Sequence, residues 1–320
     1  MSTSTMTPRR PGRGKLVKTI PGMSHSQRLR AINGANPPGI PMRSVKGLVL
    51  LIACLLVILP FVAVISTSLA DQAQINAAGG YVLFPERPTL AAYEAIFRGG
   101  VVTRATVVSI GVTLVGSALS VTVVTMLAFA LARPGTFGHK PILLMVLFTM
   151  LFSAGMIPNY LLVKQLGLLD SYWALILPTL VSGFQVILMR GFFLEVPREI
   201  IDAARIDGAG EIRILTRIMV PLSKAALAVI ALFTAVGYWN AFFNAVLYMS
   251  SAEKWPLQLV LRTYVVDNSS IGIDLPGEYI PPQQSLQMAI LVVSLVPICL
   301  VYPFLQKHFA KGVVLGAVKG

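Results

Sequence analysis

Six long apolar runs constrain the fold of this chain more than any other feature of its sequence. A helix needs about 20 apolar residues to cross the roughly 30 Å hydrocarbon layer of a bilayer, and each run is about that long. None of the runs alternates in polarity as the strands of a membrane barrel do, so they predict helices. We therefore expect an all-α integral membrane protein that spans the bilayer six times. The expected spans are Gly47–Ser68, Ala105–Ala132, Ile142–Val163, Tyr172–Phe192, Ala225–Met249 and Leu286–Leu305.

The composition agrees with this class, because 55% of the 320 residues are hydrophobic and only 12% are charged. That balance is too apolar for an ordinary soluble globule. Residues 1–45 differ from the rest: they are rich in Ser, Thr, Pro, Gly and Arg, and no acidic residue occurs before Asp71. We predict a basic, disordered cytoplasmic tail over residues 1–45 and a six-helix transmembrane domain over residues 46–320. The basic side chains of the tail are expected to lie near anionic membrane lipid.

The 26 Lys and Arg residues orient the spans. Most of them fall on one side of the membrane if the N-terminus, the loop Arg133–Lys140, the stretch Glu199–Pro221 and the C-terminus share that side. The side rich in Lys and Arg is usually cytoplasmic. We therefore expect a multi-pass protein with both termini in the cytoplasm. No aromatic-interleaved basic motif accompanies this charge, so nucleic acid is not an expected partner.

The stretch Glu199–Pro221 is a polar interruption between the fourth and fifth runs. Its first half places isoleucines and alanines at helical spacing, and Gly208 and Gly210 then break the helix. A second helix is expected to begin near Glu211 and to end at Pro221. Its apolar face would carry Ile214, Leu215 and Ile218, and Arg213 and Arg217 would lie on another face. Two short amphipathic helices joined at a glycine elbow predict a docking module outside the lipid, and a solvated connector is the alternative.

Polar and aromatic residues inside two runs are candidates for a translocation path. The fifth run holds two asparagines beside aromatic residues near its middle, and the third run holds one asparagine. Aromatic faces stack on the CH surfaces of sugar rings and amides bond their hydroxyls, so this chemistry favours a sugar. The alternative is ordinary helix packing. The candidates are Asn159, Tyr238, Trp239, Asn240, Phe243 and Asn244. In the second run, the small residues Gly111, Gly116, Ser117 and Ser120 favour close helix approach.

Several chemistries are disfavoured by the sequence. Cys54 and Cys299 each lie within an apolar run and the three histidines are scattered, so we expect no metal, no cofactor and no catalytic residue. The runs carry no ionisable residue near their middles, which disfavours a proton-coupled transporter. No GxxxxGK[ST] phosphate loop occurs in the sequence. If the chain drives uphill transport, the energy must come from another polypeptide.

The residues Asp202-Ala203-Ala204, followed at the right spacing by Gly208, Ile218 and Val220-Pro221, resemble a known signature. This signature is the EAA motif of the membrane subunits of bacterial ABC importers. Two positions depart from the motif: Asp202 stands in place of a glutamate and Val220 in place of a leucine. The segments PLSKAALAVIALFTAVGYWN, FPERPTLAAYEAIF, MIPNYLLVKQLGLLDSYWALILP and WPLQLVLR resemble the carbohydrate-uptake branch. Within that branch the chain is similar to the maltose-type second permease and to the lipoprotein-named group assigned to complex oligosaccharides.

This resemblance implies a type I ABC importer permease (MetI-like) fold, with six transmembrane helices and cytoplasmic coupling helices, in the bacterial cytoplasmic membrane. Such a subunit is not an enzyme, because a separate subunit hydrolyses ATP. The implied partners are a second homologous permease, a dimer of cytoplasmic ABC ATPases, an extracytoplasmic solute-binding protein and an oligosaccharide substrate.

The resemblance also assigns residues to the contact with the ATPase. These are Glu199, Asp202, Ala203, Ala204, Asp207, Gly208, Ile218 and Pro221. Two other functions are alternatives: an ABC permease for another small solute, such as an amino acid or a polyamine, and a stand-alone channel or membrane scaffold. The sugar, and which of the two permeases holds it, are left open.

Overall fold

The computed structural model describes residues 40–133, 135–266 and 281–317, and all regular structure within these ranges is helical. The chain divides into two compact units, Met1–Leu59 and Pro60–Gly320. Most of the tail predicted over residues 1–45 lies outside the described residues. The first predicted span falls within α2 (Ile40–Ser68), a helix whose apolar stretch is long enough to cross a membrane.

The core of the second unit forms around α5 (Val101–Leu131), which confirms that the second apolar run is one helix, long enough to cross a membrane. Its buried residues recur every three or four positions, which gives one continuous inward face. They include Ala105, Ser109, Val112, Gly116, Ser120, Val124 and Ala128.

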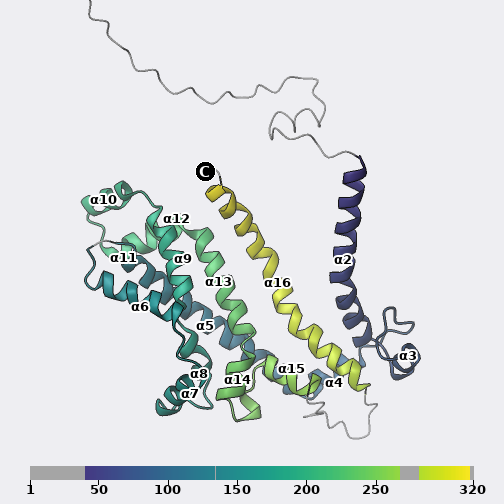
Figure 1. Ribbon diagram of the computed structural model, residues 1–320. Coiled ribbons are helices and arrows are strands. Elements are labelled where there is room, and N and C mark those ends of the chain that lie inside the picture. Colours follow the sequence, from purple (N-terminus) through teal and green to yellow (C-terminus); the bar gives the residue numbers. More distant parts are fainter. Residues whose placement is uncertain (1–39, 134, 267–280, 318–320) are drawn as a thin grey trace, which may run out of the picture. The chain divides into compact units, whose positions relative to one another are not determined.

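Two helices, α13 (Lys224–Trp239) and α9 (Gly183–Leu194), pack on α5, and α16 (Gln283–Ala317) packs on α13 (Figure 1). The short helices α3 (Gln72–Ala78) and α4 (Ala91–Arg98) precede α5.

The third run does not form the single helix expected over Ile142–Val163. It forms α6 (His139–Leu151) and α7 (Met156–Gln165), separated by a break. Phe152 is extended and Gly155 has φ +84°, a value that interrupts a right-handed helix. Pro158 lies in the first turn of α7, where a missing N–H costs no helical hydrogen bond.

The fourth and fifth runs are also interrupted. The fourth run forms α8 (Tyr172–Ile176), a 3₁₀ turn η1 (Leu177–Thr179) and α9, with a bend of 52° before α9. The fifth run forms α13 and α14 (Phe242–Tyr248). The sixth run lies in α16, which follows α15 (Leu257–Val265). Within the described residues, α2, α5 and α16 can each cross a membrane alone, and two bent helix pairs raise the number of candidate spans to five.

The short helices gather at the two ends of the second unit. In Figure 1, α10 (Arg198–Ile206) and α11 (Glu211–Ile214) lie at one end, while α7, α8 and α14 lie at the opposite end. We call the first the coupling end, after the coupling helices that the sequence resemblance implies, and the second the distal end.

A clamp centred on Asp170 ties two loops together at the distal end. The carboxylate of Asp170 accepts hydrogen bonds from the backbone N–H groups of Ser250 and Ser251 at 3.0 and 2.9 Å, and from the Ser251 hydroxyl at 2.7 Å. Lys254 donates to the same carboxylate at 2.8 Å, and the Asp170 N–H donates to the Tyr248 carbonyl at 2.7 Å. The hydrogen bonds from Lys254 and Ser251 hold the pKa of the Asp170 carboxyl well below its usual value.

Candidate functional site

The stretch between α9 and α13 forms two short helices joined at a glycine elbow, as the sequence predicts. Gly208 has φ +77°, a left-handed conformation that favours glycine, and its N–H donates to the Arg205 carbonyl at 3.0 Å. The N–H of Ala209 donates to the Ala204 carbonyl at 2.9 Å, which completes the cap of α10. We call Arg198–Leu222 the coupling segment.

Pro221 does not end the second helix, contrary to the expectation from the sequence. The chain continues from α11 through a π-helical turn, η2 (Leu215–Met219), into α12 (Val220–Leu222). Pro221 lies at the start of α12, after the wider turn has already shifted the hydrogen-bonding register, so its missing N–H is tolerated. The helix ends at Ser223, where the axis bends by 87° into α13.

The second half of the coupling segment is anchored in the bundle. Ile214 and Met219 are fully buried among side chains of α5, α9 and α13, and Leu215 packs against the same cluster. Arg213 and Arg217 are exposed on another face, as the sequence predicts. The segment therefore has one side fixed to the membrane helices.

The first half and the elbow are presented to solvent. α10 has no fully buried residue, although Ile201 and Ala204 pack partly against the bundle. Ile206 is 87% exposed and Ile212 is 80% exposed, on either side of Gly208. Two large apolar side chains held in solvent at one elbow mark a surface that another protein can cover.

Ion pairs connect the two halves of the coupling segment to α5. Glu211 pairs with Arg133, which follows the end of α5, and with Arg205 of α10 at 3.2 Å. Arg205 also lies 3.9 Å from Asp202. The Arg133 guanidinium stacks over the Phe129 ring at 3.9 Å, and burial, followed by the charge of Arg205, lowers its pKa.

The residues predicted to contact an ATPase share the coupling segment but differ in exposure. Ala204 and Ile218 are half-buried, so they face the bundle more than the solvent. The exposed members are Glu199, Asp202, Ala203, Asp207, Gly208 and Pro221.

A polar cavity of about 240 Å³ lies deeper in the bundle and is lined by four of the six predicted path residues. These are Tyr238, Asn240, Phe243 and Asn244. The Tyr238 hydroxyl donates to the Ile176 carbonyl at 3.1 Å, which fixes the ring against η1. The predicted residues thus give the cavity walls aromatic faces and two amides.

Four further polar residues of the cavity were missed from the sequence: Ser120, Thr179, Gln185 and Thr234. Gln185 is buried, and its side-chain carbonyl accepts a hydrogen bond from Thr234 at 3.3 Å. Ser120, predicted only as a small packing residue, donates to the Leu180 carbonyl at 2.6 Å. Gln185 could have been found from the sequence, because a glutamine amide stands out within the otherwise apolar fourth run.

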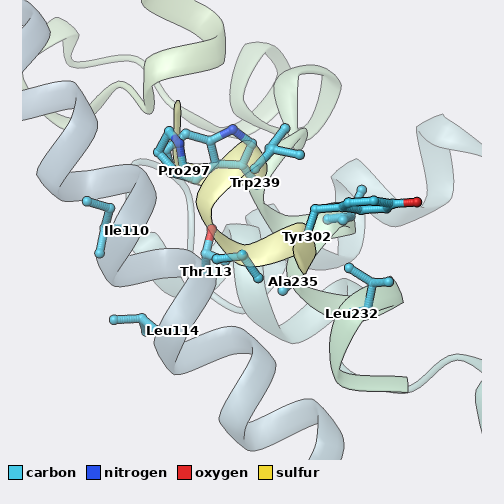
Figure 2. Close-up of a pocket in the computed structure, with 11 residues that line it drawn as sticks. Ile110, Thr113, Leu114, Leu232, Ala235, Trp239, Pro297 and Tyr302 are labelled. Atoms are coloured by element: carbon cyan, nitrogen blue, oxygen red, sulfur yellow. The ribbon is translucent and has the colours of Figure 1, made fainter. Parts of the chain in front are cut away.

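The other two predicted path residues lie elsewhere. Asn159 is exposed on α7 and does not line the cavity. Trp239 points away from its neighbour Tyr238, donates its indole N–H to the Ser294 carbonyl at 3.2 Å, and lines an apolar pocket of about 230 Å³ between α5, α13 and α16. Figure 2 shows its indole beside Pro297 in that pocket.

No three His, Cys, Asp or Glu side chains gather as a metal site would require in the part of the chain that the structure describes. Cys54 and Cys299 are free and exposed.

Comparisons with known proteins match most of the chain. The model of a family described as "Binding-protein-dependent transport system inner membrane component" matches residues 104–315. The chain is 43% identical over 278 residues to the polygalacturonan/rhamnogalacturonan transport system permease protein YtcP of Bacillus subtilis (strain 168), covering 85% of this chain and 96% of that protein. It is 46% identical over 265 residues to protein LplC of the same strain, covering 82% and 90%.

A solved structure also resembles the chain over most of its length. It is a crystal structure of a bacterial ABC transporter involved in the import of the acidic polysaccharide alginate. The TM-score is 0.76 at 30% sequence identity, and the match covers 91% of this chain and 100% of that one.

Proposed function

This chain belongs to the binding-protein-dependent transport system inner membrane components, and from that premise we propose that it is the permease subunit of an ATP-driven importer of carbohydrate. Its relatives include transport permeases named for polygalacturonan/rhamnogalacturonan and for maltodextrin, at 43% and 32% identity, and a structural neighbour serves alginate import. These names support an oligosaccharide as the substrate. The subunit itself is a transport component, and ATP hydrolysis belongs to a separate ATPase.

The observation that carries the coupling role is the pair of exposed isoleucines at the Gly208 elbow. Ile206 and Ile212 are almost fully exposed on either side of Gly208, and two such apolar side chains at one elbow favour a surface that a partner covers. The EAA-like residues Asp202 and Ala203 lie on α10, which leads into the elbow at Gly208, and in the family this motif seats in a cleft of the ATPase. We propose that the coupling segment docks on a cytoplasmic ABC ATPase dimer through this elbow.

The anchoring of the coupling segment supports a mechanical role. Ile214 and Met219 are packed into the bundle, so a displacement of the elbow would carry α11 and η2 with it. The 87° bend at Ser223 would turn this displacement into a swing of α13, the helix that bears Tyr238 of the polar cavity. Closure of the ATPase dimer would thereby switch the path between inward- and outward-open states as a rigid-body movement.

The distribution of charge supports the orientation. The coupling end carries Arg133, Arg205, Arg213 and Arg217, and the positive side of a permease faces the cytoplasm. The distal end would then face the extracytoplasmic solute-binding protein. We propose that a second, homologous permease completes the path across the polar cavity, whose amides and hydroxyls suit sugar hydroxyl groups.

The docking proposal is tested by replacing Ile206 with glutamate. The chain is co-expressed with its partner permease and an ATPase pair, and the amount of ATPase that purifies with the chain is measured. We expect Ile206→Glu to lose the ATPase and ATP-driven oligosaccharide uptake, because a charge would have to be buried in the cleft. Membrane insertion should be unchanged, since the side chain is in solvent in this chain.

Phe84→Glu is the matched control. Phe84 is 83% exposed in the loop between α3 and α4, outside the coupling segment, so the ATPase should still co-purify. Retention of the full complement of ATPase by Ile206→Glu would refute docking through this elbow.

A further inference from the structure

A second polar pocket lies behind the coupling segment, between the ends of α5 and α9 and one face of α10. Its volume is about 260 Å³. Three arginines, Arg133, Arg198 and Arg205, line it together with one acid, Asp202. The remaining lining residues are apolar, and this is a concentration of positive charge that the proposed docking and the proposed path do not use.

The pocket faces a different side of α10 from the elbow surface. Arg198, Asp202 and Arg205 recur at three- and four-residue spacing, so they share one face of the helix. Ala203 lies on another side of the helix by the same periodicity, and Ile206, one turn after Asp202, does not line the pocket. A ligand in the pocket would therefore leave Ile206 and Gly208 of the elbow uncovered, and Asp202 is the one predicted ATPase-contact residue that it would share.

The positive charge of the pocket is incompletely balanced. Glu211 and Asp202 pair with Arg133 and Arg205, whereas Arg198 makes no ion pair with a described residue. One guanidinium nitrogen of Arg133, Nη2, is buried without a hydrogen-bond partner among the described residues. A buried donor without an acceptor is costly, so Arg133 keeps hydrogen-bonding capacity that the described residues leave unused.

We propose that this pocket binds a phosphate group, held by Arg133, Arg198 and Arg205. Guanidinium groups match the oxygens of phosphate with paired, charge-assisted hydrogen bonds. Arg133 follows directly on the end of α5, a helix long enough to span the membrane, so we infer that the pocket lies near the depth of lipid headgroups. The expected source is the headgroup of an anionic phospholipid, and inorganic phosphate is the other source of the same chemistry.

A bound phosphate would join the end of α5 to α10 and so hold the coupling segment against the bundle. The effect of the phosphate on transport rests on the proposed function, whereas the binding of phosphate to the pocket does not. Binding is measured on the purified full-length chain in a non-ionic detergent, and docking is measured by ATPase co-purification. Either proposal can therefore fail while the other holds.

The test follows the thermal unfolding midpoint in two titrations. One uses short-chain phosphatidylglycerol, and the other uses sodium phosphate against sodium chloride at matched ionic strength. We expect phosphatidylglycerol to raise the midpoint saturably, because a ligand that binds the folded state stabilises it. A rise with inorganic phosphate alone would also support the site and would identify a soluble source. No rise in either titration overturns the proposal.

Arg198→Gln should weaken the apparent affinity about tenfold or more, the loss expected for one charge-assisted contact. Arg217→Gln is the matched control, because it removes the same charge from an exposed position of the coupling segment outside the pocket. Equal weakening by both variants would overturn the proposal in favour of unspecific charge attraction.

Asp202→Asn tests whether misfolding, rather than a lost contact, causes the weaker phosphate binding of Arg198→Gln. It removes the acid that faces the pocket, so the phosphate should bind more tightly, which structural damage would not produce. If Arg198→Gln leaves the affinity unchanged and Asp202→Asn does not increase it, the pocket is not a phosphate site.

Discussion

At the residue scale, the polar cavity depends on a glycine in the facing helix. A Cβ atom added to Gly116 of α5 would lie 2.8 Å from the Cε2 and Cζ atoms of the Tyr238 ring. The ring is buried and its hydroxyl is bonded to the Ile176 carbonyl, so it has little freedom to retreat. Gly116 therefore sets the position of an aromatic side chain that lines the proposed path.

We expect Gly116→Ala to destabilise the chain by about 1–3 kcal/mol through overpacking and to reduce oligosaccharide uptake by displacing Tyr238. Thermal unfolding in detergent and uptake into membrane vesicles measure the two effects. Gly111→Ala is the control, because Gly111 lies on the same helix with nothing within 4 Å of the added Cβ. It should gain up to about 1 kcal/mol of helix propensity. Equal behaviour of the two variants would contradict the positioning role of Gly116.

Asp170 offers a second test, at the distal end of the bundle. It is the non-glycine residue with positive φ among the described residues, at +57°, a conformation that asparagine also tolerates. Asp170→Asn should therefore keep the backbone but lose the charged contact to Lys254. We expect lower hydrogen-exchange protection of residues 250–254, with Glu253→Gln, a neutralised neighbour in the same turn, as the control. Unchanged protection in Asp170→Asn would show that the carboxylate does not hold the loop.

The same clamp predicts a pH dependence. Its contacts lower the pKa of the folded Asp170 carboxyl below the ordinary value of 3.8. The clamp therefore contributes fully above that ordinary value and is lost only as the pH falls through the lower, folded value. Protection factors of residues 250–254, corrected for intrinsic exchange, should stay constant from neutral pH down to about pH 5. A loss of protection near neutral pH would mean that another group controls the loop.

At the scale of elements, hydropathy predicted where apolar helices occur but not where they break. The spans within α2, α5 and α16 were predictable from their uninterrupted apolar runs. In lipid, the backbone N–H and C=O groups of such a run can form hydrogen bonds only within the helix itself. The break between α6 and α7 was not predicted: Phe152 is as apolar as the helices that it separates, and hydropathy gives no weight to Gly155, whose positive φ interrupts the helix. The cavity shows the same limit: Gln185 and Thr234 meet through packing of α9 on α13, a contact that no sequence periodicity encodes.

The elbow of the coupling segment gives a prediction at the same scale, because its two glycines differ in conformation. Gly208 has φ +77°, whereas Gly210 has φ −73°, which any residue adopts. Gly208→Val should cost at least about 1–2 kcal/mol in the left-handed conformation and shift α10 relative to α11. We expect it to reduce ATP-driven uptake at unchanged membrane levels, while Gly210→Val stays near the wild type. Full uptake by Gly208→Val would mean that the elbow geometry does not matter for coupling.

At the scale of the whole molecule, the polar cavity is too small to enclose an oligosaccharide by itself. The polar cavity holds about 240 Å³, below the roughly 300–1,000 Å³ of pockets that enclose a drug-sized ligand. An oligosaccharide is at least as large as such a ligand, so the wall formed by Tyr238, Asn240 and Asn244 can enclose only part of it. We therefore propose that the remainder of the path comes from another subunit.

We therefore expect uptake to require the second permease even when every other component is present. Proteoliposomes that contain this chain, the ATPase pair and the solute-binding protein should accumulate no labelled oligosaccharide with ATP, and addition of the homologous permease should restore accumulation. Liposomes with all components but without ATP supply the background. ATP-driven uptake in the absence of the second permease would contradict the shared path, and it would mean that the cavity of this chain opens far beyond the volume that the structure shows.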